Sequence, residues 1–485
     1  MLARAITHAL VGLEARRVEV EADVYENALP SFVIVGLPDR ACAEARQRVR
    51  SGIQAAELRF PDGRVTVNLA PAGLRKEGSG YDLPIALAVL AASRQLPHAE
   101  LDRHASVGEL ALDGRLRRVG GVLAVAEGAR RMGIERLLCP TESAAEASLA
   151  GIDALPFRHL ADAVAYLRGE LEPDDVAPPR YADPVAPPDL ADVRGHERAR
   201  RALEIAAAGG HNLLLGGPPG TGKTMLARRL PGILPTLDAE AALEVTRIHS
   251  VAGLLAHDQP LLVTPPFRAP HHSASTAAVV GGGPGIRPGE ASLAHRGVLL
   301  LDELAEFPRP TLEALRQPLE DGFICIARAA GRAIFPARFQ LVATMNLCPC
   351  GARGDPAAEC SCSAQRLAAY RDKLSRALLD RFDLVIAVPR PRADELAAGP
   401  GEASEPVAER VSSARELLAV APLRRTVEAD ELLTRAVDRL PLSGRGRARV
   451  ARVSRTIAAL AGAEQVRPEH VGEALAYRAP QELAV

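Results

Sequence analysis

The segment from His211 to Thr224 constrains the fold more than any other part of the chain. It reads HNLLLG and then GPPGTGKT, so a short apolar run leads directly into a glycine-rich loop that ends in lysine and threonine. This order is typical of a buried strand, a phosphate-binding P-loop and the first turn of a helix. It predicts a parallel α/β sheet with the loop at the carboxyl end of one strand.

The loop residues predict a site for ATP and Mg²⁺. Backbone N–H groups converge on phosphate oxygens, the Lys223 ammonium reaches the β- and γ-phosphates, and the Thr224 hydroxyl is a Mg²⁺ ligand. A plain glycine-rich turn does not account for the full match in this context. The residues predicted to bind nucleotide here are Gly217, Pro218, Pro219, Gly220, Thr221, Gly222, Lys223 and Thr224.

A second apolar run, Val298–Leu301, ends in two carboxylates, Asp302 and Glu303. In isolation such a pair is often only a helix cap. Downstream of a P-loop, it predicts that Asp302 holds Mg²⁺ through water and that Glu303 polarises the water that attacks the γ-phosphate.

The chain of 485 residues is long enough for about three domains of roughly 150 residues each. A proline-dense stretch at 172–190 interrupts the regular patterns of the chain once. A second stretch, 393–410, is rich in alanine, glycine, proline and glutamate and interrupts them again. We therefore expect an N-terminal domain at 1–170, a linker at 171–189, a core at 190–392 and a helical domain at 410–485. Expected strands are Arg17–Val24, Ser31–Val35, Arg64–Leu69, His211–Leu215, Val298–Leu301 and Gln340–Thr344; expected helices are Leu83–Ala92, Val122–Arg131, Val427–Leu440, Arg445–Ala461 and Pro468–Tyr477.

Charge and hydropathy exclude several classes of protein. The net charge is −1, so any nucleic-acid contact must come from local basic patches. No apolar run approaches the roughly 18 residues that span a bilayer, and His8 and Glu14 interrupt the N-terminus before a signal-peptide core forms. We expect a cytoplasmic protein without a membrane partner.

Four of the seven cysteines fall within the short insertion 348–362. Cys348, Cys350, Cys360 and Cys362 form two CxC pairs nine residues apart, which is enough for a tetrahedral structural zinc site. Four reduced thiols without metal are the alternative, because CxC is tighter than the usual CxxC spacing.

Two further polar positions make the middle region resemble the AAA+ ATPases. Asn346 follows the strand-like run LVAT and matches sensor 1, which orients water beside the γ-phosphate; Arg381 in LLDRFDL matches the arginine finger. A finger that reaches a neighbour's nucleotide requires an oligomer, and it accelerates other NTPases by roughly 10³ to 10⁵. Alternatively, Arg381 pairs with Asp380 or Asp383 on a surface.

The resemblance also assigns a sensor 2 arginine that touches nucleotide from the C-terminal helical lid. Helical spacing places Arg445, Arg449 and Arg452 on one face, and Arg445 is favoured ahead of Arg449. A solvated basic helix face is the alternative.

Longer phrases are similar to the magnesium-chelatase-like AAA+ group, and to the ComM/YifB family within it. They are FRAPHHSASTAAVVGGGPGIRPGEASLAHRG, LRQPLEDG and MNLCPCG, together with the N-terminal KEGSGYDLPIALAVLAA, and the likeness covers essentially the whole chain. It implies a cytoplasmic bacterial ATPase with a P-loop core, a C-terminal helical lid and an N-terminal Lon-protease-like α/β domain. It further implies a hexameric ring that drives DNA branch migration in homologous recombination and natural transformation, with recombination proteins as partners.

The segment Ile324–Phe339 contains two strand-like runs around 329–331, a pattern that predicts a hairpin carrying Arg328 and Arg332. In the family this hairpin lines the ring pore, where arginines follow the phosphates of single-stranded or branched DNA without reading sequence. Ordinary surface arginines are the alternative.

Two other functions were weighed. A Lon-like fold suggests a peptidase, but the lysine base position carries Leu123 and the nucleophile position carries Gly80 beside Ser79, so we expect no proteolysis. An ATP-driven chaperone or switch acting on a protein partner, as in a magnesium-chelatase motor, is the alternative to a DNA helicase.

Overall fold

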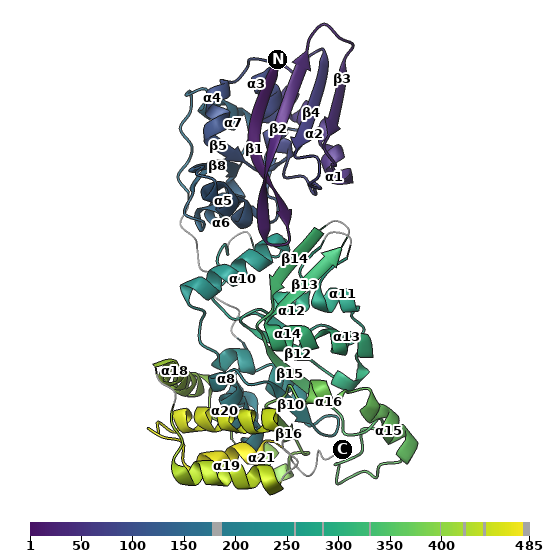
Figure 1. Ribbon diagram of the computed structural model, residues 1–485, viewed down its shortest axis with the longest axis vertical. Helices are drawn as coiled ribbons and strands as arrows, with labels where there is room; N and C mark the ends of the chain where they lie inside the picture. The colour runs from purple at the N-terminus through teal and green to yellow at the C-terminus, as the bar shows by residue number, and fades with distance from the viewer. Residues whose placement is uncertain are drawn as a thin grey trace.

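The computed structural model describes residues 1–176, 187–256, 259–283, 286–328, 331–397, 399–420, 423–439 and 443–478. These form an elongated molecule in which an N-terminal α/β unit, a P-loop core and a group of C-terminal helices follow one another along the long axis (Figure 1). Most of the predicted linker lies outside the described residues. No described helix combines the length and the hydropathy that a membrane crossing needs.

The N-terminal unit is built on a mixed seven-stranded sheet in the order β3-β4-β2-β1-β5-β8-β9. Helix α3 is buried along its whole length against this sheet, because its residues Asp82–Ala92 are almost all apolar. The strands are β1 (Leu2–Val11), β2 (Glu14–Tyr25), β3 (Ser31–Val35), β4 (Arg64–Ala70), β5 (His104–Ser106), β8 (Arg136–Pro140) and β9 (Asp153–Phe157), with a separate pair β6 (Glu109–Leu110) and β7 (Leu116–Arg117). The helices are α1 (Arg40–Ala43), α2 (Ala45–Ala55), α3, α4 (His98–Arg103), α5 (Val122–Arg131), α6 (Thr141–Ser148) and α7 (Leu160–Leu167).

The core has five parallel strands in the order β11-β12-β15-β10-β16. Strands β10, β12 and β15 are fully buried apolar runs, as expected for a parallel sheet covered on both faces. The strands are β10 (Leu213–Gly216), β11 (Phe267–Arg268), β12 (Val298–Leu301), β15 (Gln340–Met345) and β16 (Leu384–Ala387), and an antiparallel hairpin, β13 (Phe323–Arg328) and β14 (Gly331–Pro336), projects from the core. The helical segments are η1 (Leu190–Asp192), α8 (Glu197–Gly209), α9 (Lys223–Ala227), η2 (Leu230–Ile233), α10 (Ala239–Val251), α11 (Thr276–Val280), α12 (Glu290–Leu293), η3 (Leu304–Glu306), α13 (Arg309–Ala314), α14 (Arg316–Asp321), α15 (Ala364–Asp372), α16 (Arg376–Leu379) and α17 (Ala393–Ala397).

Four helices close the chain: α18 (Ser404–Val420), α19 (Val427–Arg439), α20 (Gly444–Leu460) and α21 (Pro468–Ala476). The predicted break at 393–410 is partly helical, since α17 and the first turns of α18 lie inside it. Residue 410 falls within α18, whose buried Val407 and Val411 join the core cluster of the P-loop sheet. The alanine-rich sequence that suggested a break also favours helix, and packing decides the outcome.

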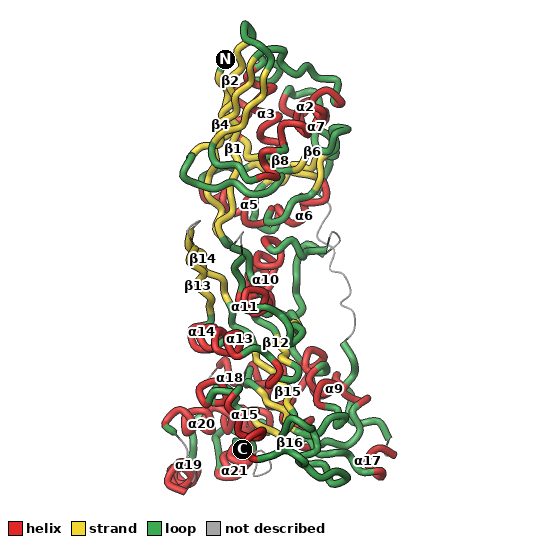
Figure 2. Tube along the Cα trace, turned by 90° about the vertical axis from the view of Figure 1, so that its right-hand side faces the viewer, coloured by secondary structure: helices red, strands yellow, loops and turns green. Residues whose placement is uncertain are grey.

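The N-terminal unit docks on the core through α10 (Figures 1 and 2). Glu146 accepts hydrogen bonds from Arg118 at 2.9 Å and from the Ser250 hydroxyl at 2.5 Å. The Gly121 N–H donates to the Ser250 carbonyl at 2.9 Å. Glu146 is 2 % exposed, so this polar cluster is sealed from solvent and fixes the orientation of the two units.

The predicted strands and helices lie close to the observed ones. Ser31–Val35, Val298–Leu301 and Val122–Arg131 match their elements at both ends, and the others differ by a few residues. The predicted hairpin is confirmed as β13–β14, although residues 329 and 330 at its turn lie outside the described part of the chain.

Candidate nucleotide-binding site

The P-loop lies at the carboxyl edge of the core sheet, between β10 and α9. The Lys223 ammonium donates hydrogen bonds to the carbonyl oxygens of Gly217 at 2.9 Å and Pro218 at 2.7 Å, and to Oδ1 of Asn346 at 3.2 Å. Burial lowers the pKa of Lys223, while the charges of Asp302 and Glu303 act in the opposite direction. A buried ammonium held by neutral oxygens at the start of a helix is prepared to receive an anion.

Asp302 and Glu303 follow β12, at the same edge of the sheet as the P-loop. Oδ1 of Asp302 accepts hydrogen bonds from the hydroxyls of Thr224 at 2.8 Å and Thr344 at 2.6 Å. A threonine hydroxyl beside a carboxylate next to a phosphate site is the oxygen donor set that Mg²⁺ prefers. Thr224 and Asp302 therefore fit a Mg²⁺ site.

Glu303 occupies an unusual backbone position directly after β12. Its φ of 55° is left-handed, which is uncommon for a residue with a side chain. Its N–H donates to the Thr344 hydroxyl at 3.0 Å, and its carboxylate lies 3.6 Å from Nδ1 of His272. The Glu303 carboxylate is thus exposed at the carboxyl edge of the sheet, with His272 as its neighbour.

A cavity of about 770 Å³ adjoins the P-loop, within the size range of small-molecule sites. Its lining includes Gly217 and Pro218 of the loop, Leu347 after β15, and Gly195 with His196 at the start of α8. This volume is suited to the base and ribose of a nucleotide whose phosphates lie on the loop. The sequence analysis missed His196, whose signal is a left-handed φ of 56° at a helix start, visible only in the structure.

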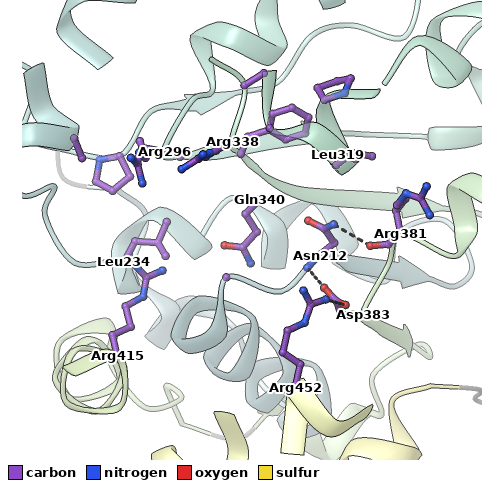
Figure 3. Close-up of a pocket in the computed structure, with 18 of the residues that line it drawn as sticks. Asn212, Leu234, Arg296, Leu319, Arg338, Gln340, Arg381, Asp383, Arg415 and Arg452 are labelled. Carbon is purple, nitrogen blue, oxygen red and sulfur yellow. Dashed lines mark hydrogen bonds and ion pairs between the residues drawn. The ribbon is translucent and has the colours of Figure 1, made fainter. Parts of the chain in front are cut away.

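Arg381 lies at the opposite, amino edge of the same sheet. The Asn212 side chain, directly before β10, donates to the Arg381 carbonyl at 2.9 Å, and the Asn212 N–H donates to Asp383 at 3.1 Å (Figure 3). The P-loop follows β10 at its other end, and four strand residues span about 13 Å. Arg381 therefore does not approach the nucleotide site of its own chain.

The amino edge opens into a cleft of about 1260 Å³ between the core and helices α18 and α20 (Figure 3). The lining is strongly cationic, because eight arginines face four carboxylates. The arginines are Arg296, Arg338, Arg381, Arg415, Arg445, Arg449, Arg452 and Arg455, and the carboxylates are Asp238, Glu320, Asp321 and Asp383. Such a surface is suited to a phosphate-bearing ligand or an acidic partner.

The sequence left two roles open for Arg381: an arginine finger, or a surface ion pair with Asp380 or Asp383. The structure contains neither of these two ion pairs. Arg381 pairs with Glu320 of α14, whereas Asp383 binds Arg452 at 2.6 Å and Asp380 binds Arg478 at 3.3 Å. The three arginines predicted to share one face of α20 do so, and all three line this cleft.

Arg445 was predicted to touch nucleotide from the lid. In the structure it lies in the amino-edge cleft, where its guanidinium is 3.7 Å from the Glu320 carboxylate. Arg445 therefore lines the same cleft as Arg381 at the amino edge of the sheet, whereas Lys223 lies at the carboxyl edge. A contact between Arg445 and nucleotide would have to involve a second chain.

The four predicted cysteines come together directly after Asn346. Their sulfur atoms all lie within 4.8 Å of one another, with 3.3 Å between Cys348 and Cys350 and 3.6 Å between Cys350 and Cys360. Tetrahedral zinc with Zn–S bonds of about 2.3 Å spaces its sulfur ligands by about 3.8 Å, so the cluster fits zinc. A backbone N–H and the neighbouring thiols lower the pKa of Cys350 to about 6, which favours the thiolate that a metal binds.

The cysteine cluster also contacts the P-loop. Gly351 has a φ of +80°, and a Cβ there would come within 2.9 Å of Cδ of Pro219. The turn between Cys350 and the rest of the cluster therefore packs against the phosphate-binding loop.

The hairpin that carries the predicted DNA contacts extends toward the N-terminal unit (Figure 1). Arg332 is exposed on β14 and its Nε donates to the Cys325 sulfur at 3.1 Å. The side chain of Arg328 lies outside the described part of the structure. The turn between β1 and β2 packs on β14, since a Cβ on Gly12 would lie 2.6 Å from Cβ of Ala333.

In the N-terminal unit, Lys76, Ser79 and Leu123 each have different surroundings. The ammonium of Lys76, which is fully buried, donates to the carbonyl oxygens of Gly36 at 2.9 Å and of Pro71. The Ser79 hydroxyl donates to the Glu109 carboxylate. Leu123 is buried in α5.

Comparisons with known proteins cover the whole chain. A family model described as magnesium chelatase, subunit ChlI, matches residues 189–396, and two others, described as subunit ChlI of Mg-chelatase and its C-terminal part, match 20–143 and 418–478. An uncharacterized protein of Mycobacterium tuberculosis is 46 % identical over 98 % of both chains. The uncharacterized protein YifB of Escherichia coli is 42 % identical, and the competence protein ComM of Haemophilus influenzae is 43 % identical, each over 99 % of this chain and 97 % of its own.

Proposed function

Because the chain belongs to the ComM/YifB family of magnesium-chelatase-like proteins, a membership that implies an ATPase, we propose that it is a ring-forming, ATP-driven DNA motor. Its action would be branch migration during homologous recombination and natural transformation. The observation that carries the proposal is the placement of two half-sites, phosphate-binding and cationic, at opposite edges of one sheet. We propose that a second chain completes each half-site.

ATP hydrolysis is proposed to use the carboxyl edge. Lys223 and the P-loop N–H groups bind the phosphates, Asn346 orients water, and Glu303 accepts a proton from the attacking water. Thr224 and Asp302 hold Mg²⁺, which would neutralise charge that develops on the phosphate oxygens.

The amino edge is proposed to serve the neighbouring subunit. Arg381 reaches the γ-phosphate bound by the next P-loop, and Arg445 or Arg449 contacts the same nucleotide. Repetition of this head-to-tail contact closes a ring, and six copies agree with the family resemblance.

DNA contact is assigned to the hairpin β13–β14, through Arg328 and Arg332. Backbone phosphates are the ligand, so binding would be independent of sequence and would weaken as salt rises. Repeated around a ring, these arginines make a basic channel from a subunit whose net charge is only −1.

We also infer that the cysteine cluster binds a structural zinc ion that braces the P-loop. Metal analysis of protein purified without oxygen should find about one zinc per chain. Replacing Cys350 by serine should remove the metal, whereas the same change at Cys325, outside the cluster, should not. Protein without zinc would overturn this assignment.

For the N-terminal unit we infer a Lon-protease-like fold that has lost peptidase activity. The support is chemical: Ser79 lacks a lysine partner, and the buried Lys76 is bonded to backbone oxygens. A casein or fluorescent-peptide assay with ATP should give no cleavage above a Lys223→Ala background.

The motor is tested with purified full-length protein, ATP and Mg²⁺ on forked and four-way DNA junctions. We expect junction movement that requires ATP hydrolysis. ATPase activity that ignores DNA, together with stationary junctions, would overturn the DNA motor and favour an ATP-driven switch acting on a protein partner.

A further inference from the structure

Arg381 is held inside the cleft and does not extend from it. Its side chain is 8 % exposed and forms its ion pair with Glu320. Among the described residues, its buried Nε has no hydrogen-bond partner. A side chain in this position has to leave Glu320 before it can reach a phosphate on another subunit.

Glu320 also interacts with the second cation of the cleft. The same carboxylate oxygen that pairs with Arg381 lies 3.7 Å from a guanidinium nitrogen of Arg445. One carboxylate therefore neutralises part of the positive charge that would otherwise face a neighbour's nucleotide.

The position of Glu320 in the chain connects it to the hairpin. Helix α14 ends at Asp321, Gly322 turns the chain with a φ of +75°, and β13 begins at Phe323. The base of the hairpin is closed by a hydrogen bond from the Ala337 N–H to the Gly322 carbonyl at 2.8 Å. A Cβ on Gly322 would lie 2.8 Å from Cγ of Arg338, so this base is tightly packed.

Both ends of the hairpin form walls of the arginine cleft. Residues 318–322, before β13, and 337–339, after β14, are part of its lining. The antiparallel ladder between them runs from the Phe323–Pro336 pair to the Arg328–Gly331 pair, a length of about 20 Å. If this ladder moves as a rigid unit, its base shifts with it, and Glu320 lies two residues before the base at Gly322.

We propose that Glu320 is a positioning residue that holds Arg381 in a withdrawn state and releases it when nucleic acid moves the hairpin β13–β14. This inference rests on the proposed function of the hairpin and of Arg381. When Arg381 leaves the Glu320 carboxylate, the phosphate of a neighbour's nucleotide replaces it as the anionic partner. A modest shift of α14 is therefore enough to change the balance between the withdrawn and the released state of Arg381. Binding of DNA in one subunit would thereby accelerate hydrolysis in its neighbour.

The test is steady-state ATPase activity of the full-length protein, with and without a single-stranded oligonucleotide, for Glu320→Gln. The glutamine has nearly the same shape but no charge, so we expect a several-fold rise in the DNA-independent kcat. The KM for ATP should stay unchanged, and stimulation by DNA should fall below about twofold. Glu313→Gln is the matched control, because Glu313 lies on the neighbouring helix α13, pairs with Arg316 and is not part of the cleft lining, so this variant should behave like wild type.

The double variant Glu320→Gln with Arg381→Ala decides whether the effect passes through Arg381. We expect it to show the rate of Arg381→Ala alone, because release of an absent side chain has no consequence. An unchanged or reduced DNA-independent rate in Glu320→Gln would overturn the proposal, as would a rise that survives in the double variant. Ring size, from light scattering, should be the same in all variants.

The same experiments distinguish failure of the proposed function from failure of the role proposed for Glu320. If DNA does not stimulate the wild-type ATPase and junctions stay stationary, the DNA motor is wrong, and release of Arg381 by nucleic acid is wrong with it. The role of Glu320 is then judged on the DNA-independent rates alone, with the same expected rise and the same dependence on Arg381.

Discussion

The two edges of the core sheet differ in how their chemistry is encoded. At the carboxyl edge, the nucleotide-binding residues lie in short consecutive motifs, and strand order brings those motifs together. At the amino edge, the cationic residues come from the segments before β12, β15 and β16 and from α18 and α20, and they share no common motif. In the proposed function, the first edge binds a phosphate in the same chain and the second meets the nucleotide of another chain.

The two edges also differ in the number of partners that hold their charged side chains. Lys223 has three acceptors within 3.2 Å, and Asp302 is fixed by two threonine hydroxyls. Arg381 has one carboxylate partner from a helix that precedes a projecting hairpin. We therefore expect regulation of the activity to act on the position of Arg381 at the amino edge, whereas loss of a P-loop group abolishes the activity.

The largest expected effect is at the carboxyl edge. Lys223→Ala should abolish ATP turnover, because it removes the P-loop ammonium that is proposed to bind the β- and γ-phosphates. Hydrolysis measured by phosphate release should fall to the background rate. Lys373→Ala removes an exposed lysine that lies 3.7 Å from Glu306, and it should retain normal activity. Wild-type turnover in Lys223→Ala would contradict the assignment of ATP hydrolysis to the carboxyl edge, and with it the contrast between the two edges.

A smaller effect is expected from Glu303→Gln, which keeps the shape of the side chain and removes its basicity. Turnover should fall by about 10² or more, while binding of a fluorescent ATP analogue persists, since general-base catalysis typically contributes that much. Glu306→Gln, three residues away, should leave kcat within about twofold. Loss of nucleotide affinity in Glu303→Gln would instead place this carboxylate among the binding groups.

The smallest of these effects concerns stability at the amino edge. Asp383 is 5 % exposed and accepts from Arg452 and the Asn212 N–H. Asp383→Asn should therefore lower the free energy of unfolding by about 2 kcal/mol, because the buried acceptor loses its charge while Arg452 stays largely exposed. Thermal and urea unfolding measure this, with the exposed Asp372→Asn as control. An effect no larger than that of the control would show that Asp383 does not organise the cleft.

The stabilisation by Asp383 should depend on pH in a defined direction. Burial raises the pKa of this carboxyl, but His211 and Arg452 act against burial and hold the pKa below 3.8. A group with a lowered pKa in the folded state stabilises it above the unfolded value and loses that effect in acid. The difference between wild type and Asp383→Asn should thus be full above about pH 5 and shrink below pH 4.

Sequence predicted the carboxyl edge well because its information is local. The strand ends at Gly216, Leu301 and Met345 were readable as apolar runs, and the side chains that follow meet because parallel strands end at one edge. The clustering of four cysteines followed from their spacing, and the structure brings their sulfur atoms together.

The amino edge was less predictable because it depends on distant packing. Glu320, the partner of Arg381, lies 61 positions earlier in the chain and belongs to no charge pattern that would indicate the pairing. The location of Arg445 away from Lys223 depends on how α20 docks on the core, which helical spacing does not specify. His196 was missed because a left-handed backbone at a helix start has no reliable signal in a single sequence.

The central claim is that a working ATPase site takes one edge from each of two chains. Arg381→Ala should lower turnover by roughly 10³, the lower end of the range for arginine fingers, and Lys223→Ala should be inactive. Mixing the two inactive proteins tests the claim directly, because an intact P-loop from one and an intact Arg381 from the other complete a site. The account predicts that the mixture regains a substantial part of the wild-type ATPase rate; a mixture no more active than the sum of the two separate proteins would contradict it.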